Sequence, residues 1–243
     1  MINALSNALA KKNIVLNDIQ KQQFQRYYEL LIEWNNKMNL TAITEKNEVA
    51  IKHFYDSLTL LMNVDVIEGA KVIDVGTGAG FPGIPLKIVR PDIKLTLLDS
   101  LNKRLIFLNE VCSSLGIDAE IIHKRAEEGG RDKNLRDKFE IATSRAVANM
   151  NTLSEYCMPY VKVGGKFVSM KGKNGTAELE KGIGAVKILG GEKEKVAEFN
   201  LPTGDERTII VINKKFPTPK QYPRQSGKIK SKPLGLEKKS IFH

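Results

Sequence analysis

The amino-acid sequence predicts an α/β protein in which helices cover both faces of a parallel sheet. From residue 71 onward, short apolar and β-branched runs alternate with segments of helical periodicity. Repeated βα units of this kind form parallel sheets. The first apolar run leads into a loop with three alternating glycines, and such loops connect a strand to a helix where a ligand approaches the backbone closely.

Helices are expected before the sheet. In residues 18–38, DIQKQQFQRYYELLIEWNNKM, apolar side chains recur at helical spacing, and residues 45–62 repeat the period. We therefore expect a helical extension over residues 1–65. His53 and Asp56 lie one turn apart on the second of these helices, where they form a structural pair or face a cleft, and we favour the structural pair.

The domain that follows, residues 66–216, contains six recognisable strands. They lie in KVIDVG, KLTLLDS, AEIIHKRAEE, KFEIATSRA, GGKFVSMKG and RTIIVINKK. Their apolar, β-branched composition indicates strands buried in a sheet. The helix in NKRLIFLNEVCSSLG is expected to end at Gly116, which supplies a C-terminal cap.

The positive charge of the chain is concentrated at its C-terminal end. The formal net charge is +10, and residues 213–243 hold nine Lys or Arg and one acid. A nearly neutral body with a basic end suits a polyanionic partner, nucleic acid first, while a solubilising tail is the alternative. Residues 217–243 are rich in Pro, Lys, Ser and Gly, and we expect them to be extended or disordered until a partner binds them.

Several classes of protein are excluded by composition. The sequence has no run of eighteen apolar residues, which excludes a transmembrane helix. Its N-terminal charges follow a weak apolar stretch, which is the wrong order for a secretory signal. The two cysteines, Cys112 and Cys157, form no CxxC pair and have no neighbouring histidines. A cytoplasmic protein that binds no metal is therefore expected, without contact to a membrane.

The glycine loop matches the dinucleotide fingerprint GxGxxG at residues 78–83, but a lone match does not identify a ligand. The glycines form a longer series behind an acid, Asp74-x-Gly76-x-Gly78-x-Gly80. A carboxylate at the end of the strand suits an ammonium group, held directly or through water, and repels a pyrophosphate. Prolines at positions 82 and 85 also remove amide donors that a pyrophosphate site needs.

A second carboxylate points to a nucleoside. Asp99 ends the second strand, where it suits the two hydroxyls of a ribose. A ligand with a ribose, an ammonium group and no phosphate is S-adenosylmethionine. One alternative is an NAD-dependent dehydrogenase, which would need a hydride-relay histidine beyond residue 150, where only His243 occurs. The other is a non-catalytic RNA-binding protein, which would not need Asp74, Gly76 and Asp99 together.

A set of segments occurs in one order along the chain: WNNKMNLTAI, HFYDSL, DVGTGAGFPGIPL, LLDSLNKRLIFL, RAEE, SRAVANM and the MKG after the fifth strand. With these segments the chain resembles the bacterial small-subunit ribosomal RNA guanine-N7 methyltransferase G family, also called glucose-inhibited division protein B. The resemblance implies a Rossmann-like class I S-adenosylmethionine-dependent methyltransferase fold with a mostly parallel seven-stranded sheet, a helical N-terminal extension and a basic tail.

The resemblance also implies the reaction, which is methyl transfer to N7 of one guanine in the decoding-region loop of 16S ribosomal RNA. The RNA or the small ribosomal subunit is then the partner, and a monomer is expected. Because guanine N7 carries an in-plane lone pair, no general base is required. Arg145 and Lys171, at the ends of adjacent βα units, are the positioning candidates on the RNA side. The expected cofactor-binding residues are Asp74, Gly76, Gly78, Gly80, Phe81, Asp99, Ser100, Ala126, Glu127 and Arg145.

Overall fold

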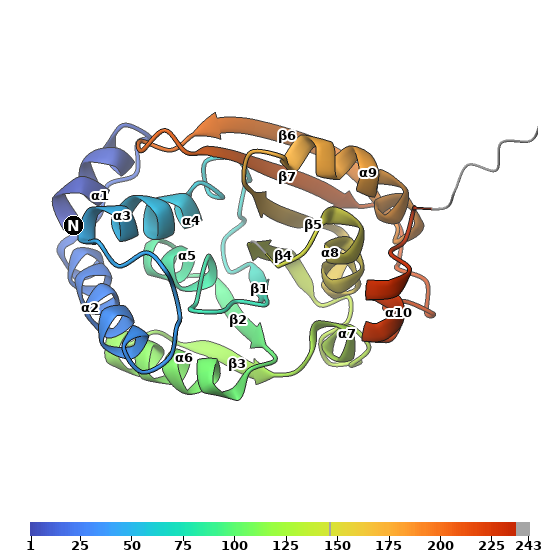
Figure 1. Ribbon diagram of the computed structural model, residues 1–243, viewed down its shortest axis with the longest axis horizontal. Coiled ribbons are helices and arrows are strands. Elements are labelled where there is room, and N and C mark those ends of the chain that lie inside the picture. The colour runs from blue at the N-terminus through green and yellow to red at the C-terminus, as the bar shows by residue number, and fades with distance from the viewer. Residues whose placement is uncertain (146, 237–243) are drawn as a thin grey trace, which may run out of the picture.

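Figure 1 shows the computed structural model of the chain, which describes residues 1–145 and 147–236. One seven-stranded sheet has the order β3-β2-β1-β4-β5-β7-β6. Its strands are β1 (Lys71–Val75), β2 (Lys94–Asp99), β3 (Ala119–His123), β4 (Phe139–Arg145), β5 (Val161–Lys171), β6 (Gly191–Asn200) and β7 (Glu206–Lys214). Strands β1 to β5 are parallel, and β7 is antiparallel to both of its neighbours. The mostly parallel seven-stranded sheet is confirmed.

Strand β6 is the one that the residue pattern did not predict. Half of the residues in its sequence, GEKEKVAEFN, are charged, and the strand lies at the edge of the sheet beside β7. An edge strand faces water along much of its length, and charged side chains there prevent pairing with another chain. Strand β6 therefore lacks the apolar run by which the other strands are recognised.

Two helical layers cover the sheet. Successive strand residues point to opposite faces, so that Val72 belongs to one apolar core and Ile73 to the other. The first core includes side chains of α5 (Gly83–Val89) and α6 (Asn102–Leu115). The second includes side chains of α8 (Met150–Cys157), the short 3-10 helix η2 (Met158–Tyr160) and α9 (Gly175–Ile188). Helix α6 ends as expected, at Gly116 with φ +62°. In the described part of the chain, no helix has both the length and the apolar character to cross a membrane.

The N-terminal helices pack on the same face as α5 and α6. They are α1 (Ile2–Ala10), α2 (Asp18–Asn35), α3 (Lys46–Glu48), the π-helix η1 (Val49–Tyr55) and α4 (Asp56–Leu58). Phe24 of α2 and Phe54 of η1 stand 5.0 Å apart between ring centres. The Tyr27 hydroxyl donates to the Ala79 carbonyl at 2.5 Å, which ties α2 to the glycine loop. The helical extension is thus part of the core that supports the loop.

The C-terminal segment differs from the sequence expectation. Residues 217–236 pack against the body and contain α10 (Ser226–Ser231), which packs against α8 at the edge of the molecule near α7 (Ala126–Gly129) in the view of Figure 1. Ile229 is completely buried. Arg224 donates from Nε and Nη2 to both carboxylate oxygens of Glu155, whose side chain has no exposed surface. A buried bidentate ion pair therefore holds a segment whose composition predicts disorder. Residues 237–243 of the expected tail lie outside the described residues.

Candidate functional site

The carboxyl ends of β1, β2 and β4 open onto a cavity of about 560 Å³, which we call the first cavity. The strand order reverses between β1 and β4, since β2 and β3 lie on one side of β1 and the later strands on the other. Ligands of open α/β sheets bind at such switch points. Eight of the ten residues expected from the sequence line this cavity: Gly76, Gly78, Phe81, Asp99, Ser100, Ala126, Glu127 and Arg145. Residues from four separate loops thus meet around one space.

Asp74 and Gly80 lie beneath the loop instead. Asp74 Oδ2 accepts hydrogen bonds from the Thr77 hydroxyl at 2.7 Å and the Gly83 amide at 2.8 Å. At Gly80, φ is +94°, and a Cβ there would stand 2.5 Å from the Tyr27 hydroxyl oxygen. Both residues therefore shape the loop from below. Asp74 was expected to hold an ammonium group directly or through water, and its side chain does not line this cavity.

The Asp74 carboxyl is nevertheless unusual. The side chain is fully buried, and its Oδ1 has no hydrogen-bond partner within residues 1–145 and 147–236. Burial raises the pKa of Asp74 from its ordinary 3.8 to about 6, against the hydrogen bonds from Thr77 and Gly83, which lower it. A buried acid below a cavity favours a ligand with positive charge.

Asp99 is held firmly in the wall of the first cavity. Its side chain is nearly buried, and Oδ2 accepts from the Gly78 amide at 2.9 Å while Oδ1 accepts from the Leu101 amide at 2.9 Å. Arg104 lies 3.3 Å from Oδ2. These bonds fix the carboxylate at the carboxyl end of β2. This is the position from which an acid accepts hydrogen bonds from ribose hydroxyls.

Helix α7 supplies the next part of the wall. The Ala126 carbonyl accepts from the Tyr160 hydroxyl at 2.6 Å, which fixes the start of the helix. The Glu127 side chain is mostly buried and lines the cavity, as does Ser100 from the loop after β2. Two acidic side chains, Asp99 and Glu127, are therefore present in the wall.

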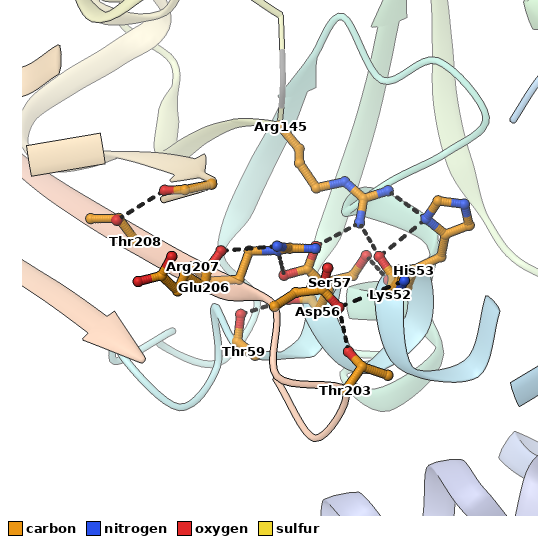
Figure 2. Close-up of polar contacts among 12 residues, drawn as sticks. Lys52, His53, Asp56, Ser57, Thr59, Arg145, Thr203, Glu206, Arg207 and Thr208 are labelled. Carbon is orange, nitrogen blue, oxygen red and sulfur yellow. Dashed lines mark hydrogen bonds and ion pairs between the residues drawn. The ribbon is translucent and has the colours of Figure 1, made fainter. Parts of the chain in front are cut away.

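Arg145 takes part in the ion-pair network drawn in Figure 2. Its Nη1 lies 3.1 Å from Asp56 Oδ2 and 3.2 Å from the Lys52 carbonyl oxygen. Arg207 of β7 donates from Nε to the other carboxylate oxygen, Asp56 Oδ1, at 3.1 Å. The Asp56 side chain is 5% exposed. One buried carboxylate thus joins two arginines from distant parts of the chain and fixes both of them.

His53 completes this network. Its ring stacks on Phe81 with centres 4.8 Å apart, and the Arg145 guanidinium carbon stands 4.9 Å from the centre of the same Phe81 ring. His53 Nε2 lies 2.8 Å from the Thr41 hydroxyl. Burial and then the charge of Arg145 lower the pKa of His53 from 6.5 to about 3. His53 is therefore neutral at physiological pH and faces the cavity as well as its structural partners.

A second cavity, of about 540 Å³, adjoins the first. His53, Arg145 and Val147 line both cavities. The second cavity is also lined by Asp56, Lys171, Glu178 and Arg207. Lys171, at the end of β5, donates to the Ala148 carbonyl and pairs with Glu178. The two positioning candidates therefore occupy different places, with Arg145 at the junction of the cavities and Lys171 in the second.

Sequence reasoning missed several residues of the first cavity. Lys230 and Ser226 of α10 and Thr41 from the loop after α2 line it. They come from segments far from the glycine loop in sequence, and the only signal that pointed to one of them was the basic charge of the tail. No group of three or more His, Cys, Asp or Glu side chains that could hold a metal gathers among the described residues.

Solved structures with a similar chain path identify the fold. A SAM-dependent methyltransferase from Aquifex aeolicus is similar with a TM-score of 0.51 and 16% identity, over 69% of this chain and 93% of that chain. A SAM-dependent O-methyltransferase from Thermotoga maritima is similar with a TM-score of 0.51 and 18% identity, over 75% and 71%. At such identities the likeness shows the fold, which is the Rossmann-like fold of these methyltransferases.

Sequence relatives identify the family. The GidB family model, described as rRNA small subunit methyltransferase G, matches residues 20–210. Ribosomal RNA small subunit methyltransferase G of Lactobacillus johnsonii is 51% identical over 93% of this chain and 96% of its own length. The enzyme of the same name from Staphylococcus carnosus is 49% identical over 95% and 97%. The chain belongs to the rRNA small subunit methyltransferase G family, and the resemblance seen in the sequence is confirmed.

Proposed function

We propose that this protein binds S-adenosylmethionine in the first cavity and methylates N7 of one guanine in the decoding-region loop of 16S ribosomal RNA. The observation that supports this most directly is the convergence of Gly76, Phe81, Asp99, Glu127 and Arg145 on one cavity in a chain of this family. The substrate is the RNA or the small ribosomal subunit.

The residues of the first cavity fit a cationic nucleoside. Asp99 is fixed by two backbone amides in a position to accept from ribose hydroxyls. Ala126 and Glu127 would flank the adenine, and Gly76, with φ +72°, allows the chain to pass close to the ligand. Asp74 Oδ1, which has no partner among residues 1–145 and 147–236, adds negative charge beneath the loop that favours a sulfonium and an ammonium group. Phe81 would pack against the methionine portion.

In the reaction, the N7 lone pair forms the new bond to the methyl carbon while the electron pair of the sulfur–methyl bond stays on sulfur, leaving a neutral thioether and a cationic base. No proton moves, so the protein needs no general base. The low pKa of His53, about 3, makes its imidazole a weak base, which agrees with this requirement. The role of the chain is to align the base, and alignment of two substrates contributes roughly 7–11 kcal/mol. We assign that role to Arg145 and Lys171.

We propose a soluble cytoplasmic monomer without a metal cofactor, built from an extension over residues 1–65, a methyltransferase domain over residues 66–216 and a basic C-terminal segment. Size-exclusion chromatography with light scattering tests the monomeric state, and metal analysis of the purified protein tests the absence of a metal cofactor. Limited proteolysis tests the domain division.

The main experiment compares ligands and substrates. Calorimetric titration should show binding of S-adenosylmethionine, and labelled methyl groups should then enter small subunits or 16S RNA as N7-methylguanosine, identified by mass spectrometry of nucleosides. Binding of NAD alone would contradict the proposal. Cofactor binding without transfer to any of these substrates would favour a non-catalytic RNA-binding protein.

A pair of variants tests the cofactor site. Asp99→Ala should weaken binding of S-adenosylmethionine by about 10- to 100-fold, because hydrogen bonds to a charged acceptor are lost. Asp118→Ala is the matched control, since Asp118 is exposed in the loop between α6 and β3. Equal affinity of the two variants would contradict the ribose assignment.

A further inference from the structure

The second cavity contains an ion pair with hydrogen-bonding capacity to spare. Lys171 is the last residue of β5, and Glu178 lies in the first turn of α9. Lys171 Nζ and Glu178 Oε2 are 2.8 Å apart, and both residues line the cavity together with Gly172. The Lys171 side chain is almost completely buried. Ion pairs in such a place are expensive to bury unless their remaining hydrogen-bonding positions are used.

The free capacity lies on Glu178. Its Oε2 is buried, although the side chain as a whole is one-third exposed. Lys171 Nζ, 2.8 Å away, is its one partner in the part of the chain that the structure describes, so the remaining acceptor capacity lies on the exposed part of the carboxylate. A carboxylate accepts about four hydrogen bonds. Lys171 donates to Ala148 and has further N–H groups, so the pair presents one donor beside one acceptor.

This order of groups matches one edge of guanine. From O6 to N1 to N2, guanine presents an acceptor and then two donors, whereas adenine presents a donor at N6 and an acceptor at N1. A lysine ammonium beside a carboxylate complements guanine and opposes adenine. Discrimination is needed because both purines have an N7 acceptor in the same position. The chemistry at N7 does not select the base by itself.

The arrangement of the two cavities also favours an orientation in which the N1–N2 edge of guanine faces the ion pair. The two cavities share His53, Arg145 and Val147, while Lys171 and Glu178 line only the second. N7 and the N1–N2 edge lie on opposite sides of a guanine ring. A base in the second cavity with N7 toward the shared wall therefore directs its N1–N2 edge toward the ion pair. A volume of about 540 Å³ accommodates a nucleoside.

We propose that Lys171 and Glu178 are the guanine-recognition pair, with Lys171 donating to O6 and Glu178 accepting from N1–H and N2–H. This inference rests on the proposed function and assigns the second cavity to the target base. During methyl transfer the base becomes cationic, which strengthens its N–H donors. The contact with Glu178 is therefore stronger in the transition state than in the bound ground state, and it raises kcat in addition to binding.

The test uses Glu178→Gln and small-subunit RNA with guanine or inosine, which lacks the N2 amino group, at the target position. Wild-type protein should favour guanine over inosine by about 10- to 100-fold in kcat/KM, since a hydrogen bond to a charged group is lost. Glu178→Gln should lower kcat/KM for guanine by a similar factor, partly through kcat. Its preference for guanine over inosine should fall to about threefold or less, because the group that accepts from N2–H has lost its charge and the two changes therefore act on one contact.

Controls separate this role from a structural one. Glu180→Gln makes the same chemical change on an exposed position of α9 and should behave as wild type. Affinity for S-adenosylmethionine and the free energy of unfolding should be alike in all three proteins. A wild-type enzyme that methylates guanine and inosine equally would overturn the proposal even if the variant fails to fold. Undiminished preference in Glu178→Gln would also overturn it. Absence of any transfer by wild-type protein would refute the proposed function itself, and the inference with it.

Discussion

The pH dependence of stability tests the environment of Asp74. We expect Asp74→Asn to change how the free energy of unfolding varies with pH, because burial raises the pKa of this carboxyl from 3.8 to about 6 in the folded protein. A raised folded pKa means that folding favours the neutral form. The stability that the group contributes is present in full below pH 3.8 and is lost as the pH rises through about 6.

The size of the effect follows from the shift. About 2 pKa units correspond to about 3 kcal/mol between the two protonation states. Roughly half of this change falls between pH 5 and pH 7, with the rest at lower pH. The free energy of unfolding of wild type, minus that of Asp74→Asn, should therefore rise by about 1 kcal/mol from pH 7 to pH 5. The asparagine keeps an acceptor for the Gly83 amide, so the loop is retained.

Urea denaturation at several pH values measures this difference, because contributions of other titrating groups cancel between the two proteins. Asp65→Asn is the matched control, since its carboxylate is exposed, and its difference from wild type should stay constant over the same range. A difference for Asp74→Asn that does not change between pH 5 and pH 7 would refute the argument, since it would mean that Asp74 stays charged at little cost.

Three further outcomes are expected. Asp56→Asn unpairs two arginines whose side chains are 15% and 22% exposed. It should lower the free energy of unfolding by about 3 kcal/mol in urea titrations, and a loss below about 1 kcal/mol would contradict the network's role. Arg224→Met leaves Glu155 buried without its partner, so we expect a similar decrease in the free energy of unfolding and faster proteolysis within residues 217–236. An unchanged digestion pattern would show that other contacts hold this segment. Neutralising three basic residues of α10 and its C-terminal end, Lys228, Lys230 and Lys232, should make the dependence of log K for RNA binding on log salt shallower by about 2. Fluorescence anisotropy at several salt concentrations measures this slope, and an unaltered slope would mean that these side chains do not contact RNA.

Neutralising the three lysines is a cleaner test of RNA binding than deleting residues 217–236. Residues 217–236 bury Ile229 and Thr218, so their removal would expose apolar surface and leave Glu155 unpaired. Loss of RNA binding in a truncated protein would then have two explanations. Charge neutralisation at exposed lysines leaves the buried contacts intact and measures the electrostatic contribution alone.

The sequence alone determined the parts of this protein that depend on local order along the chain. Alternation of apolar strands with helices required a parallel sheet, and the turn after β1 required glycines at Gly76, Gly78 and Gly80, all of which have positive φ. Asp99 could be assigned to the site because the carboxyl ends of parallel strands meet at one edge. These features are set by backbone geometry within a few residues.

Only the tertiary structure decided which distant side chains meet and which polar groups become buried. Asp74 lies beneath the loop because the Thr77 hydroxyl and the Gly83 amide bind it there, although its position in the sequence also suits a ligand. His53 reaches the cavity because it stacks on Phe81, and Lys230 reaches it because a buried ion pair between Glu155 and Arg224 docks the basic segment. Two charged residues 69 positions apart leave no periodic pattern in a sequence. Their pairing contributes to stability only after the fold has brought both side chains together and out of water.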